Sequence, residues 1–184
     1  DPLEWMIDET HKRGFSFMCW MNAFRVTTET YVTNGSALSL PVSELVQMKH
    51  DALANLAEGN FAKEHPEYVI AGSYDEKLIL NPSEPAVQKF IVDTIMEIVE
   101  NYDVDAIHFD DYFYADGIDD SETRAKYNTE GLSVSDFRRK QVDTFIYNLK
   151  LELDEFNAQN NRFVQLGISP TGVYKNASSQ TEAN

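Results

Sequence analysis

The chain has 184 residues, of which 42% are hydrophobic and 12% aromatic, and its formal net charge is −16. This composition is typical of a folded globular protein with a sizeable core rather than of a disordered chain. A strongly acidic surface without a basic stripe repels nucleic acid, and no apolar run is long enough to span a bilayer. We therefore expect neither a nucleic-acid partner nor a membrane-spanning segment.

The first third of the chain predicts a helix, a buried strand and an insertion. Residues 2–13 carry apolar side chains at helical spacing and end at Gly14. Residues 15–24, FSFMCWMNAF, form a dense apolar run of strand length. Residues 27–67 are turn-rich and polar, with one short helix expected before Gly59. We interpret this long segment as an insertion after the strand.

A hairpin, a helix and a second buried strand are predicted next. The runs at 68–72 and 77–82 are two short strands joined by a turn. Ser83 is expected to cap a strongly amphipathic helix that extends to residue 102. The run VDAIHF at 104–109 then predicts a buried strand of the main sheet.

The last part of the chain repeats the pattern of loop, helix and strand. Residues 115–132 indicate an acidic loop, and a helix is expected to begin at Ser133 or Ser135. A polar turn at 157–162 leads to an apolar strand at 163–174. The overall order predicts one α/β domain over residues 1–184, with parallel strands and right-handed crossovers.

Polar residues follow each predicted strand of the main sheet, in WMNAFR, HFDDYFY and GISPTG. In parallel sheets and barrels the carboxyl ends of the strands hold the active site. We therefore expect the functional residues at this edge. The chain contains no Gly-rich phosphate loop and no cluster of Cys and His, so we expect no cofactor and no metal.

The segment HFDDYFY places two adjacent carboxylates at the end of a buried strand. Because side chains alternate along a strand, His108 and Asp110 share one face, and Ile107 and Phe109 share the other. The apolar pair is expected to pack against covering helices, which directs His108 and Asp110 inward. The direction of Asp111 stays open because the chain turns there.

An inward carboxylate at this position suits three tasks: attack on an anomeric carbon, proton abstraction from water, or metal binding. The aromatic residues 112–114, with Trp20 and Arg25 near an earlier strand end, favour a carbohydrate cleft. A pair of aspartates at a strand end can equally cap the following turn. A lone histidine such as His108 is more often a core residue than a catalyst.

Five collinear blocks carry a resemblance to a known family. The segment DAIHFDDYFY resembles DGIHFDDYFYP of the glycosyl hydrolase-like 10 family, a group of bacterial cell-envelope proteins with a TIM-barrel catalytic domain. The family's WFNPYRV, LNPGxPEVRxYI, DWRRxNVNxFI and GISPFGIWRN are similar to further blocks in the same order. These are CWMNAFRV, LILNPSEPAVQKFI, DFRRKQVDTFI and GISPTGVYKN.

The resemblance implies a (β/α)8 TIM-barrel fold and a glycosidase that acts on glycan strands of bacterial peptidoglycan. A complete barrel takes about 250 residues, so we expect an incomplete barrel of central βα units. The family also implies a cell-envelope or secreted protein, either periplasmic or a lipoprotein. Asp110 and Asp111 are the expected catalytic residues. The expected carbohydrate-binding residues are Trp20, Asn22, Arg25, Asn81, His108, Tyr112 and Ser169.

A second carboxyl group is needed, because glycosidases use two at defined separations. Neighbouring aspartates on a strand point to opposite faces, so Asp110 and Asp111 make a poor pair. Glu29 and Glu44 in the insertion, or residues outside this chain, are the alternatives. Two rival functions stay open: a non-catalytic carbohydrate-binding protein, and a metal-dependent hydrolase with Asp110, Asp111 and His108 as ligands.

Overall fold

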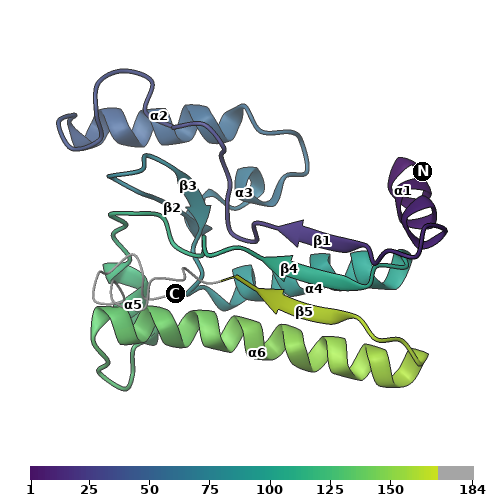
Figure 1. The fold of residues 1–184 in the computed structure, drawn as a ribbon. Coiled ribbons are helices and arrows are strands. Elements are labelled where there is room, and N and C mark those ends of the chain that lie inside the picture. The colour runs from purple at the N-terminus through teal and green to yellow at the C-terminus, as the bar shows by residue number, and fades with distance from the viewer. Residues whose placement is uncertain (170–184) are drawn as a thin grey trace.

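The structure is a computed structural model that describes residues 1–169. Its centre is a three-stranded parallel sheet in the order β1–β4–β5 (Figure 1). These strands are Met18–Met21, Ala106–Phe109 and Gln165–Ile168. An antiparallel hairpin pairs β2, Val69–Ala71, with β3, Leu78–Leu80. The predicted α/β class, parallel strands and hairpin are confirmed, whereas the incomplete barrel stays a prediction.

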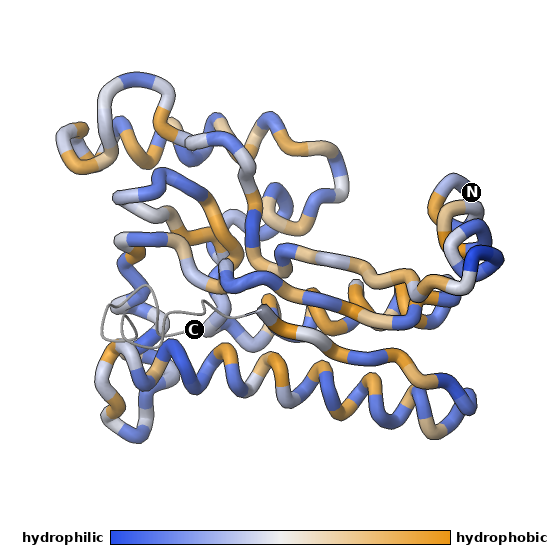
Figure 2. Tube along the Cα trace, viewed as in Figure 1, coloured by the Kyte–Doolittle hydropathy of each residue, from blue (hydrophilic) through white to orange (hydrophobic). Residues whose placement is uncertain are grey.

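Two long amphipathic helices pack against the sheet. Helix α4, Pro85–Asn101, and helix α6, Val134–Asn160, lie side by side along it (Figure 1). The ring of Phe109 in β4 lies 5.7 Å from that of Phe145 in α6. Ile107 and Phe109 are almost completely buried, so the prediction that these two side chains face the helices is confirmed. In Figure 2 the strands are largely hydrophobic and the helices alternate between hydrophobic and hydrophilic residues.

The remaining helices are shorter and lie around this centre. Helix α1, Pro2–His11, precedes β1, and α5, Ser121–Tyr127, follows β4. The predicted insertion contains α2, Val42–Ala54, α3, Phe61–Glu64, and the 3-10 turn Pro66–Tyr68. The ring of Phe61 stacks on Phe90 of α4 with centroids 3.9 Å apart, which attaches the insertion to the main body. None of the helices within residues 1–169 is long and apolar enough to cross a membrane.

The structure corrects the expected acidic loop at 115–132, because α5 forms inside it. Asp120 precedes this helix and is buried, yet it accepts hydrogen bonds from Arg124 and Arg138, each Nε at 2.9 Å. Burial alone would raise the pKa of Asp120, but the two guanidinium groups outweigh burial and lower it. A pattern of local charges does not reveal such a pairing, because Arg138 comes from another helix.

Two helix boundaries also differ from the expected ones. Ser83 does not cap α4: its hydroxyl lies 3.1 Å from that of Tyr114, and Glu84 is the residue before the helix. Helix α6 extends into the predicted polar turn and ends at Asn160; the next residue, Asn161, adopts the left-handed conformation that asparagine tolerates. Ser133 caps α6 as expected, and its side chain accepts a hydrogen bond from the Asp136 N–H.

Candidate active site

The strand register brings three polar residues together at the carboxyl edge of the sheet. Trp20, His108 and Gly167 are aligned across β1, β4 and β5. Two residues further on, each strand has ended, and the next side chains in these rows belong to Asn22, Asp110 and Ser169. Because side chains alternate, residues two apart share a face. The structure therefore brings together residues from three sequence blocks separated by more than fifty positions each.

Asp110 is held at this edge by hydrogen bonds from neutral groups. The Asn22 side-chain N–H₂ donates to both carboxylate oxygens, at 3.2 and 3.0 Å. The backbone N–H of Tyr112 donates to Asp110 Oδ1 at 3.0 Å. The contact with Tyr112 spans only two residues and stabilises the turn after β4. Asp110 therefore has the turn-capping role that was considered from the sequence. The bond from Asn22 crosses from another strand and fixes the orientation of the carboxylate independently of the turn.

Asn22 has one further group that bears on the site. Its side-chain oxygen is buried and has no hydrogen-bond partner among the residues that the structure describes. Buried polar atoms are almost always hydrogen-bonded in folded proteins. A ligand hydroxyl beside the Asn22 side-chain oxygen would supply the hydrogen bond that this oxygen lacks.

His108 lies one step deeper on the same face as Asp110. Its Nε2 lies 2.9 Å from the Ser169 hydroxyl, and its ring meets the edge of Trp20 at a centroid distance of 5.7 Å. A Cβ added to Gly167 would lie 2.6 Å from His108 Nδ1, so the absence of a side chain at Gly167 makes room for the imidazole. Trp20 is 71% exposed, which leaves its ring available for a ligand.

Tyr112 connects the Asp110 edge to the β2–β3 hairpin. Its hydroxyl donates to Asp75 Oδ2 at 2.8 Å, and the Arg25 guanidinium lies 4.7 Å above its ring. Burial, followed by the hydrogen bond to Asp75, raises the pKa of Tyr112. Within residues 1–169, no carboxylate, Asp110 included, lies within ion-pair distance of Arg25. Asp75 was not among the residues singled out from sequence.

Two of the predicted site residues, Asn81 and Asp111, make no hydrogen bond to Asp110 among those that the structure describes. Asn81 is only 3% exposed, donates to the Thr123 hydroxyl at 2.7 Å and accepts from the Ser83 N–H at 3.0 Å. Its amide is therefore used inside the fold, and we do not keep it in the proposed carbohydrate site. Asp111 is exposed, and its backbone carbonyl accepts from the Phe113 N–H at 3.2 Å. The catalytic role predicted for Asp111 stays a prediction.

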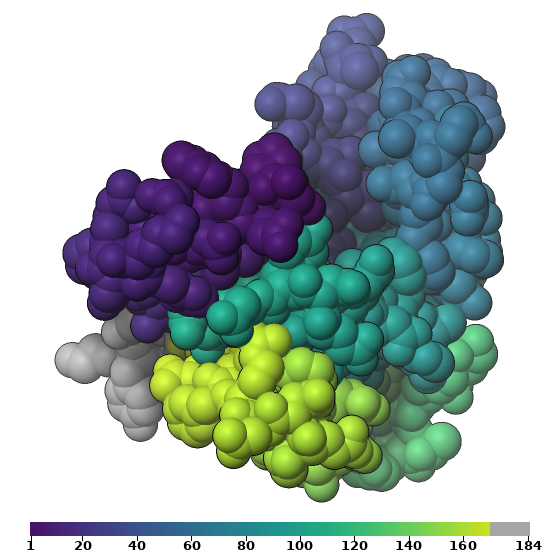
Figure 3. All heavy atoms as spheres, turned by 90° about the vertical axis from the view of Figure 1, so that its right-hand side faces the viewer, coloured from purple at the N-terminus to yellow at the C-terminus, as the bar shows by residue number. Residues whose placement is uncertain are grey.

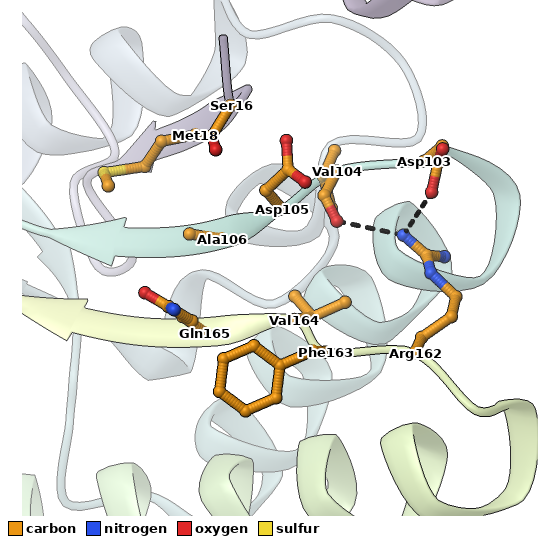
Figure 4. Close-up of a pocket in the computed structure, with 10 residues that line it drawn as sticks. All are labelled: Ser16, Met18, Asp103, Val104, Asp105, Ala106, Arg162, Phe163, Val164 and Gln165. Carbon is orange, nitrogen blue, oxygen red and sulfur yellow. Dashed lines mark hydrogen bonds and ion pairs between the residues drawn. The ribbon is translucent and has the colours of Figure 1, made fainter. Parts of the chain in front are cut away.

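A cleft of about 460 Å³ lies at the opposite end of the same sheet. Figure 3 views this end of the molecule, where the N-terminal segment, the start of β4 and the residues before β5 adjoin. The cleft is lined by charged and apolar side chains (Figure 4). Arg162 crosses it to Asp103 at 3.1 Å and donates to the Val104 carbonyl at 2.9 Å. These contacts join the segment before β5 to the segment before β4. Residues at this end of a parallel sheet usually stabilise the fold.

Among residues 1–169, no three His, Cys, Asp or Glu side chains come together in an arrangement that could hold a metal ion. His108 is engaged with Ser169 rather than directed with the two aspartates at a common point.

The sequence of the chain matches the family described as glycosyl hydrolase-like 10 over residues 1–183. The chain belongs to this family. The resemblance predicted from the five sequence blocks is therefore confirmed.

Two relatives illustrate the similarity. The chain is 34% identical over 183 residues to the glycosyl hydrolase YngK of Bacillus subtilis strain 168, covering 96% of this chain and 31% of that protein. It is 30% identical over 187 residues to the glycosyl hydrolase DigH of Escherichia coli K12, covering 97% of this chain and 37% of that protein. The chain thus spans about a third of the length of the curated relatives it matches.

A solved structure resembles the fold. The GH36 α-galactosidase AgaA from Geobacillus stearothermophilus superposes with a TM-score of 0.50 at 13% identity, covering 92% of this chain and 19% of that chain. At this level of identity the likeness concerns the fold alone. It agrees with an α/β arrangement built on a parallel sheet.

Proposed function

We propose that the protein is a glycoside hydrolase of bacterial peptidoglycan glycan strands, in which Asp110 acts on the anomeric carbon or on the attacking water. The membership of a glycosyl hydrolase family supports the reaction class. The position of Asp110 at the carboxyl edge of a parallel sheet, oriented by Asn22 from a neighbouring strand, is the observation that carries the assignment. Such a substrate implies that the protein acts in the cell envelope or as a secreted protein.

The surroundings of Asp110 suit a sugar ring. The exposed face of Trp20 offers an apolar platform of the kind that stacks on a pyranose. The Arg25 guanidinium, exposed above Tyr112, is placed to bind an anionic substituent such as the lactyl carboxylate of a muramic acid. His108 and Ser169 form a hydrogen-bonded pair that is available to sugar hydroxyls.

We do not propose Asp111 as the second carboxyl group, because neighbouring residues of a strand point to opposite faces and make a poor acid and base pair. Glu29 and Glu44 are exposed in the insertion. In the part of the chain described, neither side chain hydrogen-bonds with the cluster formed by Asp110, Asn22 and Tyr112. We therefore propose that the second carboxyl comes from a residue outside this cluster, in the remaining length that the relatives have.

A non-catalytic carbohydrate-binding protein is the alternative. It is favoured by the exposed Trp20 and Arg25, which suit sugar binding without cleavage. Such a protein would keep the aromatic platform and the cation but would hold no acid at the working separation from Asp110.

The test compares the full-length protein with its Asp110→Asn variant on purified peptidoglycan glycan strands, with and without a chelator. The proposal predicts release of reducing ends by the wild type, no release by the variant, and no effect of the chelator. Binding of strands without cleavage by the wild type would support the carbohydrate-binding alternative. Loss of cleavage on chelation would instead support the metal-dependent hydrolase.

A further inference from the structure

Asp75, in the turn of the β2–β3 hairpin, accepts hydrogen bonds from its own turn and from the loop that follows Asp110. Its Oδ2 accepts from the Tyr112 hydroxyl at 2.8 Å and from the Asp116 backbone N–H at 3.2 Å. Its Oδ1 accepts from the Lys77 N–H at 3.2 Å. The carboxylate therefore ties its own turn to the loop that follows Asp110.

The contact between this turn and the loop is tight. A Cβ on Gly72 would lie 2.0 Å from Asp75 Oδ1 and 2.7 Å from the Asp116 carbonyl, so only glycine fits there. The Ser73 hydroxyl donates to the Gly117 carbonyl at 2.9 Å. Gly117 has a φ of +73°, and a Cβ there would meet Ser73 at 2.3 Å. Because the two segments meet with so little space, a shift of Asp75 is transmitted directly to the loop.

Tyr112 carries this connection to Asp110. Its backbone N–H donates to Asp110 Oδ1 at 3.0 Å, and its hydroxyl at the far end of the ring donates to Asp75. Burial and the neighbouring carboxylate raise the pKa of Tyr112, so the phenol remains a proton donor throughout the physiological pH range. One residue thus holds two carboxylates, one with its main chain and one with its side chain.

We infer that Asp75 is a positioning residue, which fixes Tyr112 and thereby the orientation of the Asp110 carboxylate; this inference rests on the proposed function. Among residues 1–169, the groups that hold Asp110 are neutral: the Asn22 amide and the Tyr112 N–H. Its orientation therefore depends on how firmly the backbone at Tyr112 is held. The ring of Tyr112 also carries Arg25, so the same tether places the cation over the site.

The experiment uses the full-length protein and four variants: Tyr112→Phe, Asp75→Ala, the double variant, and Asp116→Ala as the control. Asp116 is exposed in the same loop, and only its backbone atoms take part in the contacts above. The measurements are kcat and KM on glycan strands, together with the thermal unfolding midpoint. Tyr112→Phe removes only the hydroxyl and keeps the ring beneath Arg25.

A misplaced catalytic group costs up to about a hundredfold in rate, so we expect kcat to fall by about ten- to a hundredfold in each single variant. KM should change little because the Tyr112 hydroxyl is directed at Asp75 and not at the substrate. The double variant should be no slower than the slower single variant, since both act through one connection. Asp116→Ala should behave as the wild type.

The outcomes separate this inference from the proposed function. If the wild type cleaves, Asp110→Asn does not, and Tyr112→Phe keeps full kcat with only a lower unfolding midpoint, the positioning role is wrong and the function stands. The same holds if the two single effects multiply in the double variant. If Asp110→Asn cleaves as well as the wild type, the proposed function itself is wrong, and the positioning role falls with it.

Discussion

The two ends of the parallel sheet both carry aspartates, but they hold them in different ways. At the amino end, Asp105 accepts from the Phe17 N–H at 2.6 Å and lies 2.8 Å from His11 Nε2, while Asp103 pairs with Arg162. At the carboxyl end, Asp110 is held by neutral N–H groups from Asn22 and Tyr112.

This difference is the reason for proposing Asp110, and not the carboxylates of the amino end, as the catalytic group. A cation beside a carboxylate stabilises its charge and reduces its use as a nucleophile or base, whereas neutral donors orient it without neutralising it. A cleft of about 460 Å³ lies at the amino end, yet its charged groups are already engaged with one another and with backbone carbonyls. The partners of the carboxylates, rather than the size of the hollow, thus indicate the site.

The largest effect is expected for Asp110→Asn. A catalytic carboxylate contributes about 10²–10⁴-fold to rate, so cleavage of glycan strands should fall by that factor. Unfolding by denaturant should change little, since the amide can still accept from Tyr112. A variant that loses stability and activity in parallel would place Asp110 with the fold-maintaining carboxylates.

Arg162→Ala should have the opposite profile. The guanidinium donates to the backbone carbonyls of Val99, Tyr102 and Val104 around the end of α4. Losing these charged hydrogen bonds should lower the free energy of unfolding by about 2–3 kcal/mol. Denaturant titration measures that loss, and kcat per folded molecule should equal that of the wild type. A lower kcat in fully folded protein would show that the amino end acts in the reaction.

Trp20→Ala should affect binding more than stability. The ring is 71% exposed, so its removal should change the free energy of unfolding by no more than about 0.5 kcal/mol, as for other surface substitutions. Loss of a stacking platform should weaken glycan binding by about tenfold, which corresponds to about 1.4 kcal/mol. Isothermal titration of the glycan into an inactive Asp110→Asn background measures this, and unchanged affinity would remove Trp20 from the site.

The smallest expected effect concerns pH. Burial alone would raise the pKa of Asp105, but the hydrogen bonds from the Phe17 N–H and from His11 outweigh it and lower the value. A lowered folded-state pKa gives stability that is present above the unfolded value of about 3.9 and is lost as pH falls through the folded value. The carboxylate is 42% exposed, so we expect solvent to limit the contribution to about 1 kcal/mol. The stability difference between wild type and Asp105→Asn should shrink as the pH falls below about 4.

Local sequence patterns predicted much of the fold and part of the site. Alternation along β4 placed His108 and Asp110 on one face and Ile107 and Phe109 in the core, because strand periodicity is a local property. The position of Asn22 beside Asp110 followed from the rule that parallel strands end at one edge.

Other features depend on contacts between distant segments, which periodicity does not contain. The interior position of Asn81 is set by Thr123, and the helix α5 is fixed by the pairing of Asp120 with Arg138. The role of Asp75 depends on a hairpin turn that packs on a loop about forty residues away. The sequence feature that comes closest to indicating Asp75 is the aromatic run after Asp110. A tyrosine in such a run, Tyr112, usually needs a hydrogen-bond partner for its hydroxyl when the ring is partly buried.

The central claim is that the carboxyl end of the sheet, and not the amino-end cleft, receives the glycan. A crystal structure of the full-length Asp110→Asn variant with a bound glycan oligosaccharide tests it most directly. The account predicts a sugar ring against Trp20, with its scissile bond at position 110 and an anionic group at Arg25. A sugar seated instead among Met18, Asp105 and Gln165, with position 110 untouched, would contradict it.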